Sequence, residues 1–166
     1  GPDELWAVGS RFVATSTAVL ALHWDGRQWT QVAAPPTGGY YNDFLAIAAR
    51  ARDDIWTAGN YSDQAGNMRL LHWEGRSWQA VAVPPEAAGG QILGLAALGS
   101  DDAWAVGARD QDLTIALHWD GRSWQSVETP AGLGRLTTVA GSAPGDVWAA
   151  GRTADHQPVL VHRVGQ

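Results

Sequence analysis

Cysteine is absent from this 166-residue chain, and lysine is absent as well, so all 11 basic residues are arginine. Without cysteine there are no disulfides, no thiolate zinc sites and no thiol nucleophiles. No apolar run approaches the roughly 20 residues of a membrane-spanning helix, and no signal-peptide pattern opens the chain. Acids outnumber bases by 17 to 11, the reverse of the balance in most nucleic-acid-binding proteins. The sequence therefore predicts no nucleic-acid partner and no membrane span.

Tryptophan is abundant, with 10 residues in the chain, and it recurs in three sets. The first set precedes a glycine by three positions: Trp6, Trp56, Trp104 and Trp148. The second set directly follows a histidine: Trp24, Trp73 and Trp119. The third set lies five residues further on: Trp29, Trp78 and Trp124. Because these sets account for all ten, every tryptophan is predicted to be architectural.

The repeated unit predicts four short strands. In the second unit these strands cover residues 44–50, 55–60, 69–73 and 77–83, and a pair of prolines ends the last one. Acid–glycine turns such as Asp25-Gly26 and Asp120-Gly121 indicate hairpins, and no segment has a sustained helical period. Four antiparallel strands, repeated along the chain, are typical of a β-propeller blade. The predicted class is all-β.

The unit resembles a kelch or galactose-oxidase-type blade. The similarity lies in residues 55–59 (Ile-Trp-Thr-Ala-Gly), in His72-Trp73-Glu74-Gly75, and in Trp78 followed by Pro84-Pro85. The double glycine of kelch is single here, since Asn60 follows Gly59. A related bacterial repeat family with its own tryptophan-rich consensus is therefore an equal alternative. The resemblance implies an architecture and leaves the function open.

The repeats divide the chain into units of about 1–36, 37–85, 86–130 and 131–166. The first unit lacks its first strand and the last lacks its fourth, which predicts about three and a half blades. Closed propellers have roughly four to eight blades. Three readings stay open: a small four-bladed ring, a piece of a longer propeller, or one half of a ring made by two chains. Incomplete terminal sheets leave unpaired edges, so self-association through them is predicted.

The repeated histidines invite a metal interpretation: His23, His72, His118 and His162. Each instead lies on a strand with apolar residues on both faces, which predicts a structural role in which the imidazole bonds a backbone group or an aspartate of its own blade. The paired acids, such as Asp53-Asp54, are predicted to shape turns through their own backbone. No catalytic residue, metal site or cofactor is predicted. The loops around Asp63 and Asp110 lack the spacing of a calcium-binding hand.

One rim of the propeller should carry the ligand, because its loops vary while the turns of the other rim repeat. The candidate ligand-binding residues on the variable rim are Tyr40, Tyr41, Asn42, Asp43, Tyr61, Asp63, Asn67, Arg109, Asp112, Arg152 and His156. Such side chains suit a protein or glycan ligand. The first strands of the units contain almost no titratable side chains, so a non-catalytic binding propeller is favoured. The alternatives are a lectin-like propeller and a non-catalytic fragment of a propeller enzyme.

The composition indicates the type of genome that encodes the chain. Exclusive use of arginine, with abundant alanine and glycine, is typical of a GC-rich bacterial genome. Resemblance to tryptophan-rich bacterial propellers favours a location outside the cytoplasm, but the absence of cysteine is compatible with either compartment.

Overall fold

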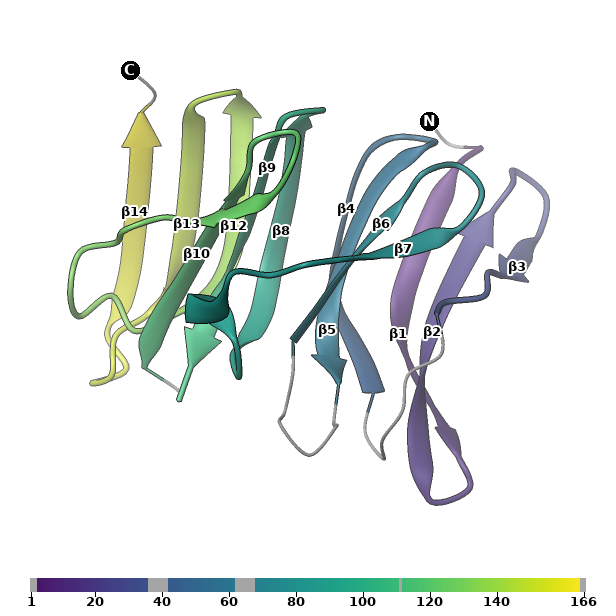
Figure 1. Cartoon of the computed structure of the whole chain (residues 1–166), viewed down its shortest axis with the longest axis horizontal. Coiled ribbons are helices and arrows are strands. Elements are labelled where there is room, and N and C mark those ends of the chain that lie inside the picture. Colours follow the sequence, from purple (N-terminus) through teal and green to yellow (C-terminus); the bar gives the residue numbers. More distant parts are fainter. Residues whose placement is uncertain (1–2, 36–41, 62–67, 111, 165–166) are drawn as a thin grey trace.

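The computed structural model describes residues 3–35, 42–61, 68–110 and 112–164. These residues form four antiparallel sheets that follow one another along the chain, side by side (Figure 1). The first sheet contains β1 (Leu5–Val13), β2 (Ser16–Trp24) and β3 (Trp29–Gln31). The second contains β4 (Asn42–Ala51), β5 (Asp54–Tyr61), β6 (Met68–Trp73) and β7 (Trp78–Val81). The chain is therefore all-β, as predicted.

The third sheet follows a short 3-10 helix, η1 (Pro85–Ala87). It contains β8 (Gln91–Gly99), β9 (Asp102–Arg109), β10 (Leu113–Trp119) and β11 (Trp124–Ser126). The fourth contains β12 (Arg135–Ala143), β13 (Asp146–Arg152) and β14 (Pro158–Val164). In the part of the chain that the structure describes, no helix has the length and apolar character needed to cross a bilayer.

The sheets contain three, four, four and three strands, as the repeats predict. In the two complete sheets the strands pair in sequence order, from β4 to β7 and from β8 to β11. The order in the first sheet corresponds to the second, third and fourth strands of a blade, and that in the last sheet to the first three. Within the described ranges, β1 and β14 therefore each have one open edge.

A close backbone approach explains the glycine that ends each tryptophan strand. A Cβ atom built on Gly59 would lie 1.8 Å from the carbonyl oxygen of Asp43, and one on Gly107 would lie 1.8 Å from that of Gln91. The first strand bulges at this point, since its register shifts between Phe44 and Ala46 in the second sheet. Gly9 is the exception, because nothing lies within 4 Å of its Cβ position. Glycine is therefore sterically required at this position only in sheets whose first strand packs against it.

Apolar residues fill the three spaces between neighbouring sheets. The cluster between the second and third sheets is the largest and includes Trp56, Leu70, Ile92, Leu117 and Trp124. Smaller clusters lie between the first and second sheets and between the third and fourth. Both faces of an inner blade are therefore core, which is why Leu70 and Leu71 are 1% and 0% exposed.

Tryptophans connect the first sheet to the second and the second to the third in the same way. The second-strand ring of one blade contacts two rings of the following blade: Trp6 lies 5.0 Å from Trp73 and 5.6 Å from Trp78. Trp56 lies 4.9 Å from Trp119 and 5.0 Å from Trp124. The prediction of architectural tryptophans is confirmed for these rings. Two rings at the ends of the array differ, because Trp29 and Trp148 are 46% and 42% exposed.

Candidate binding rim

Each blade contains one acid, one histidine and one tryptophan in contact. In the second sheet His72 Nε2–H donates a hydrogen bond to Asp54 Oδ1 (2.8 Å), and the imidazole stacks on Trp56 at 4.2 Å. The same unit recurs in the other sheets: Glu4–His23–Trp6, Asp102–His118–Trp104 and Asp146–His162–Trp148. Adjacent paired strands bring the three side chains together. The predicted structural role of the histidines is confirmed.

The predicted role of the paired acids is wrong for the second member of each pair. Asp54 and Asp102 are 7% and 8% exposed and bond side chains across the sheet instead of their own turn. Asp54 also pairs with Arg50 Nε at 2.5 Å, and Asp102 accepts from Trp104 Nε1 at 2.7 Å. A buried carboxylate needs such partners, and the matching histidine lies on another strand, which local turn preferences do not reveal.

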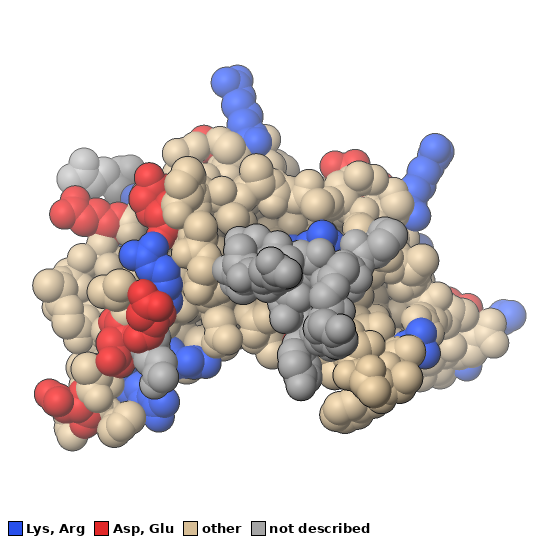
Figure 2. Space-filling model, turned by 60° about the horizontal axis from the view of Figure 1, so that its bottom comes forward, with Lys and Arg blue, Asp and Glu red and all other residues tan. Residues whose placement is uncertain are grey.

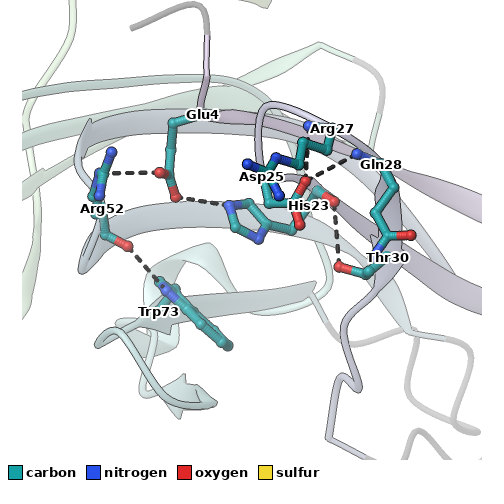
Figure 3. A network of polar contacts seen from close by, with 8 residues as sticks. All are labelled: Glu4, His23, Asp25, Arg27, Gln28, Thr30, Arg52 and Trp73. Atoms are coloured by element: carbon teal, nitrogen blue, oxygen red, sulfur yellow. Dashed lines mark hydrogen bonds and ion pairs between the residues drawn. The ribbon is translucent and has the colours of Figure 1, made fainter.

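Glutamate replaces aspartate in the first blade and reaches the next one (Figure 3). One carboxylate oxygen of Glu4 accepts from His23 at 2.7 Å, and the other pairs with Arg52 Nε at 3.0 Å. Trp73 Nε1–H in turn donates to the carbonyl of Arg52 at 3.1 Å. The longer side chain thus forms a polar link between the first and second sheets.

The tight turns between third and fourth strands are shaped by other aspartates. Asp120 Oδ1 accepts hydrogen bonds from the backbone N–H groups of Arg122 and Ser123, both at 2.9 Å. These bonds, that from Ser123 first, hold the pKa of Asp120 below its ordinary value of 3.8. Asp25 makes the equivalent bonds to Arg27 and Gln28, and its pKa is lowered for the same reason. The rim that carries these turns therefore repeats the same structural hydrogen bonds from blade to blade.

No group of three or more acidic, histidine or cysteine side chains converges on a possible metal position among the described residues. The acid–histidine pairs lie one to a blade. Each imidazole already bonds a carboxylate and stacks on an indole, so what the arrangement does chemically is hold neighbouring strands together.

The opposite rim carries the predicted ligand-binding residues, of which several fall outside the described ranges. Tyr40, Tyr41, Asp63 and Asn67 lie outside them, and Tyr61 is described only as the last residue of β5. Asn42 is 2% exposed. Its backbone N–H donates to Thr17 Oγ1 at 2.7 Å and its side-chain amide donates to the Thr17 carbonyl at 3.0 Å. Asn42 therefore belongs to the contact between two sheets, while Asp43 beside it is half-buried.

Arg109 is held in place at the end of β9. Its Nη1 donates to the carbonyl of Glu86 in η1 at 3.0 Å, and its Nε lies 3.7 Å from Asp110 Oδ2. Asp110 itself adopts a left-handed backbone, with φ of 50°. The guanidinium therefore joins the second-to-third connection to the third sheet and presents its remaining N–H groups at the rim.

Asp112, Arg152 and His156 are exposed. The loop after β13 is ordered by its own backbone, since His156 N–H donates to the Thr153 carbonyl and Thr153 N–H to the Gln157 carbonyl, both at 2.9 Å. Within the described ranges, no hydrogen bond or ion pair engages the side chain of Asp112 or of Arg152. In Figure 2, which brings this rim forward, most visible acids lie at the left, over the third and fourth sheets.

Two features of this rim were missed by sequence reasoning. Phe12, near the tip of the β1–β2 hairpin, is 89% exposed. Arg135 Nη2 donates to Gln91 Oε1 at 3.3 Å and joins β12 to β8. Strand alternation could have placed Phe12 at the hairpin end, but the contact of Arg135 depends on how successive sheets stack.

Two cavities adjoin the open edges of the array. One of about 420 Å³ lies beside β1 and is lined by Leu5, Trp6, Ile47, Arg50 and Ile55, among others. The second, of about 370 Å³, lies between the third and fourth sheets beside β14. Both have the volume of pockets that bind small ligands, roughly 300–1,000 Å³.

Comparison with known proteins identifies the fold. A solved structure described as "YCF48 bound to D1 peptide" is similar, with a TM-score of 0.58 and 19% sequence identity. The similarity covers 90% of this chain and 44% of that one, so this chain spans less than half the length of the matched propeller. No family model matches the sequence, and no curated protein matches it. The chain is a set of β-propeller blades, and its kelch-like character remains a prediction.

Proposed function

We propose that the chain is part of a non-catalytic propeller that binds a polypeptide on its variable rim. The observation that carries this proposal is the likeness to a propeller whose structure contains a bound peptide. The rim itself supports it: Arg109 is oriented by η1, and the exposed Asp112 and Arg152 retain their full hydrogen-bonding capacity. Rigid strands that present polar loops are a common arrangement for recognition.

Selection from a random peptide library displayed on phage tests this function. We expect peptides that bind the parent chain and lose at least tenfold in affinity to the double variant Asp112→Ala/Arg152→Ala. Both side chains are exposed and bond no other described residue, so the double variant should melt at the parent temperature. Arg76→Ala, on the opposite rim, is the matched control and should bind like the parent.

Three results would contradict polypeptide binding on this rim. The first is a selection that yields no peptide. The second is a set of peptides that bind the parent and the double variant with equal affinity. The third is a glycan array on which the parent binds one sugar class while no peptide is recovered, because that result assigns the rim to a lectin. Turnover in a hydrolase or oxidase screen that disappears in the double variant would contradict the non-catalytic part.

A second function, head-to-tail association of two copies, is favoured by the exposed faces at the two ends of the array. Leu5 and Trp29 are 48% and 46% exposed on the first sheet, and Trp148 and Leu160 are 42% and 65% exposed on the last. The equivalent inner residues are buried, since Trp56 and Trp78 are 2% and 3% exposed. The last sheet of one copy would thus cover the first sheet of another as Trp56 meets Trp119 and Trp124.

Light scattering tests the association. The expected mass is twice the 17.6 kDa of one chain, because two copies supply eight sheets, within the usual range of propellers. Trp148→Ala and Trp29→Ala should each return the mass toward one chain, whereas Phe12→Ala, at the more exposed tip of the β1–β2 hairpin, should not. A parent that remains monomeric at millimolar concentration would contradict the association.

A further inference from the structure

The β1–β2 hairpin extends further at the variable rim than the described strands of the other sheets (Figure 1). β1 continues to Val13, whereas β5 and β9 end at Tyr61 and Arg109. Both of these end residues are the counterparts of Arg11 in the repeat. In the two complete sheets the first strand pairs with the second no further out than this position. Phe12 therefore lies beyond the part of a blade that a first strand covers, and its 89% exposure is a property of the hairpin itself.

The base of this hairpin is fixed on the second sheet. Thr17, which lies opposite Phe12 in the register, is buried. Its Oγ1 accepts a hydrogen bond from the backbone N–H of Asn42 at 2.7 Å, and its carbonyl accepts one from the side-chain amide of Asn42 at 3.0 Å. Side chains that lie directly opposite in an antiparallel pair share a face. Phe12 thus belongs to the face of the hairpin that meets the second sheet, and an anchored strand pair carries it.

The sequence of the hairpin tip does not serve the stability of the fold. The ring of Phe12 buries almost no apolar surface, so it contributes almost no hydrophobic stabilisation. Ala14 in the turn adopts a left-handed backbone with φ of 51°, a conformation that favours glycine or asparagine over alanine. Side chains and backbone conformations that are unfavourable for folding are expected where a segment serves binding. The tip is therefore the strongest candidate for a contact surface outside the polar loops.

The hairpin is also a basic segment of an acidic molecule. Between Leu5 and Leu22 the only formally charged side chain is that of Arg11, although the net charge of the chain is −6. Most of the acids visible on this rim lie at its other end, over the third and fourth sheets (Figure 2). A polypeptide segment that carries carboxylates beside an apolar side chain therefore complements the hairpin in both charge and polarity.

We propose that the β1–β2 hairpin is the apolar anchor of the binding rim, and that the polypeptide on this rim carries an acidic segment whose aromatic or aliphatic side chain packs against Phe12. The inference rests on the proposed function and names the chemistry of the partner. Aromatic residues are enriched in protein interfaces, and Arg11 attracts the carboxylates of the segment. A single cation is too few for attachment to an anionic membrane, which draws on clusters of about four to eight basic residues.

Two pools of short labelled peptides test the proposal by fluorescence anisotropy. Every peptide has a central phenylalanine or leucine, flanked by glutamate, aspartate, serine and glycine in the acidic pool and by lysine, arginine, serine and glycine in the basic pool. The acidic pool should bind the parent chain at least tenfold more tightly than the basic pool. Equal binding of the two pools, or tighter binding of the basic pool, would overturn the predicted chemistry of the partner.

A substitution at the hairpin tip tests the location. Phe12→Ser should weaken binding of the acidic pool at least tenfold without lowering the melting temperature, because the ring buries so little surface. Val164→Ser is the matched control: Val164 is also an exposed apolar residue, 70% exposed, but it ends β14 at the opposite rim, and its variant should bind like the parent. Equal affinity of the acidic pool for the parent and for Phe12→Ser would overturn the role of the hairpin.

A charge reversal tests the contribution of Arg11. Arg11→Glu should weaken binding of the acidic pool at least tenfold at low ionic strength, and the loss should shrink at high salt because salt screens exposed charges. Arg76→Glu makes the same change of net charge in a turn of the opposite rim and should have a much smaller effect. Equal losses in the two variants would show a dependence on net charge alone and would overturn the assignment to Arg11.

The same measurements distinguish this inference from the proposed function. Binding of the acidic pool that is insensitive to Phe12→Ser leaves a peptide-binding rim and overturns the hairpin as its anchor. Binding that depends on Phe12 and is unchanged in Asp112→Ala/Arg152→Ala supports the hairpin and contradicts the polar site of the proposed function. Absence of saturable binding of either pool would overturn both.

Two controls address other occupants of the tip. Sedimentation with vesicles of phosphatidylglycerol and phosphatidylcholine should leave the chain in the supernatant, and vesicle binding that is lost in Phe12→Ser would assign the tip to a membrane surface. Light scattering should give the same mass for the parent and for Phe12→Ser. A lower mass for the variant would assign the tip to contact with a second copy, and either result would overturn the polypeptide partner.

Discussion

At the scale of single residues, tryptophans at equivalent positions of the repeat differ in burial. Trp56 is 2% exposed and touches three other rings, while Trp148 is 42% exposed and, among the described residues, stacks only on His162, at 3.9 Å. Trp56→Ala should therefore cost about 3–5 kcal/mol of unfolding free energy, a large share of the roughly 5–15 kcal/mol of a domain. Trp148→Ala is the matched control and should cost clearly less.

Urea denaturation followed by circular dichroism measures both variants. A Trp56→Ala variant as stable as the parent would contradict the architectural role of the inner tryptophans and the interpretation of the interfaces that rests on it.

Ionised Asp120 stabilises the turn that it shapes, and the pH dependence follows from its lowered pKa. A carboxylate with a lowered folded-state pKa contributes stability above its ordinary pKa of 3.8, and that contribution is lost as the pH falls through the folded-state value. Asp120→Ala should therefore lower the melting temperature at pH 6, and the difference from the parent should shrink below pH 3.8. A difference that grows on acidification would contradict this assignment.

At the scale of elements, the position of a neighbouring strand decides which glycines are replaceable. A Cβ atom on Gly107 would meet the Gln91 carbonyl at 1.8 Å, so β8 would have to move, and Gly107→Ala should cost about 1–3 kcal/mol or more. Gly9 occupies the same position in β1 and meets nothing within 4 Å. Gly9→Ala should leave the melting temperature unchanged or raise it slightly.

The comparison of the two melting temperatures is sensitive because the sequence contexts match, Ala-Val-Gly in both. Equal destabilisation by the two substitutions would show that the glycines serve backbone conformation and not strand approach.

The strands themselves were largely predictable from the sequence, because repetition reveals boundaries that a single unit leaves ambiguous. The predicted strand 69–73 differs by one residue from β6, and the tight turns lie at the predicted acid–glycine dipeptides. The bonds of Asp54 were not predictable, because His72 and Arg50 reach it from different strands. The burial of Asn42 was missed for the same reason, since its partner Thr17 lies in another sheet.

At the scale of the whole molecule, stability should be distributed along the array. In the described part of the chain each apolar cluster joins two neighbouring sheets, so the two inner sheets bury both faces and the outer sheets bury one. In such quasi-one-dimensional architectures the ends open more readily than the middle. Hydrogen exchange should therefore be slowest in β5 and β9 and at least tenfold faster in β2 and β14.

The exchange experiment is best performed on Trp148→Ala, so that association of copies does not protect the end faces. Uniform protection across the four sheets would contradict the nearest-neighbour description and indicate a ring closed between the first and last sheets.

The free space around the Cβ position of Gly9 also has a consequence for engineering. In the two complete sheets the first strand needs a glycine opposite its bulge, and β1 already carries that glycine with free space in front of it. The adjoining cavity of about 420 Å³ exposes Leu5, Trp6 and Ile47, the side chains that such a strand would cover. A segment copied from β4 and fused ahead of the chain could therefore pair with β1 as a first strand. No residue of β1 would have to be substituted for this fourth strand of the first sheet to fit.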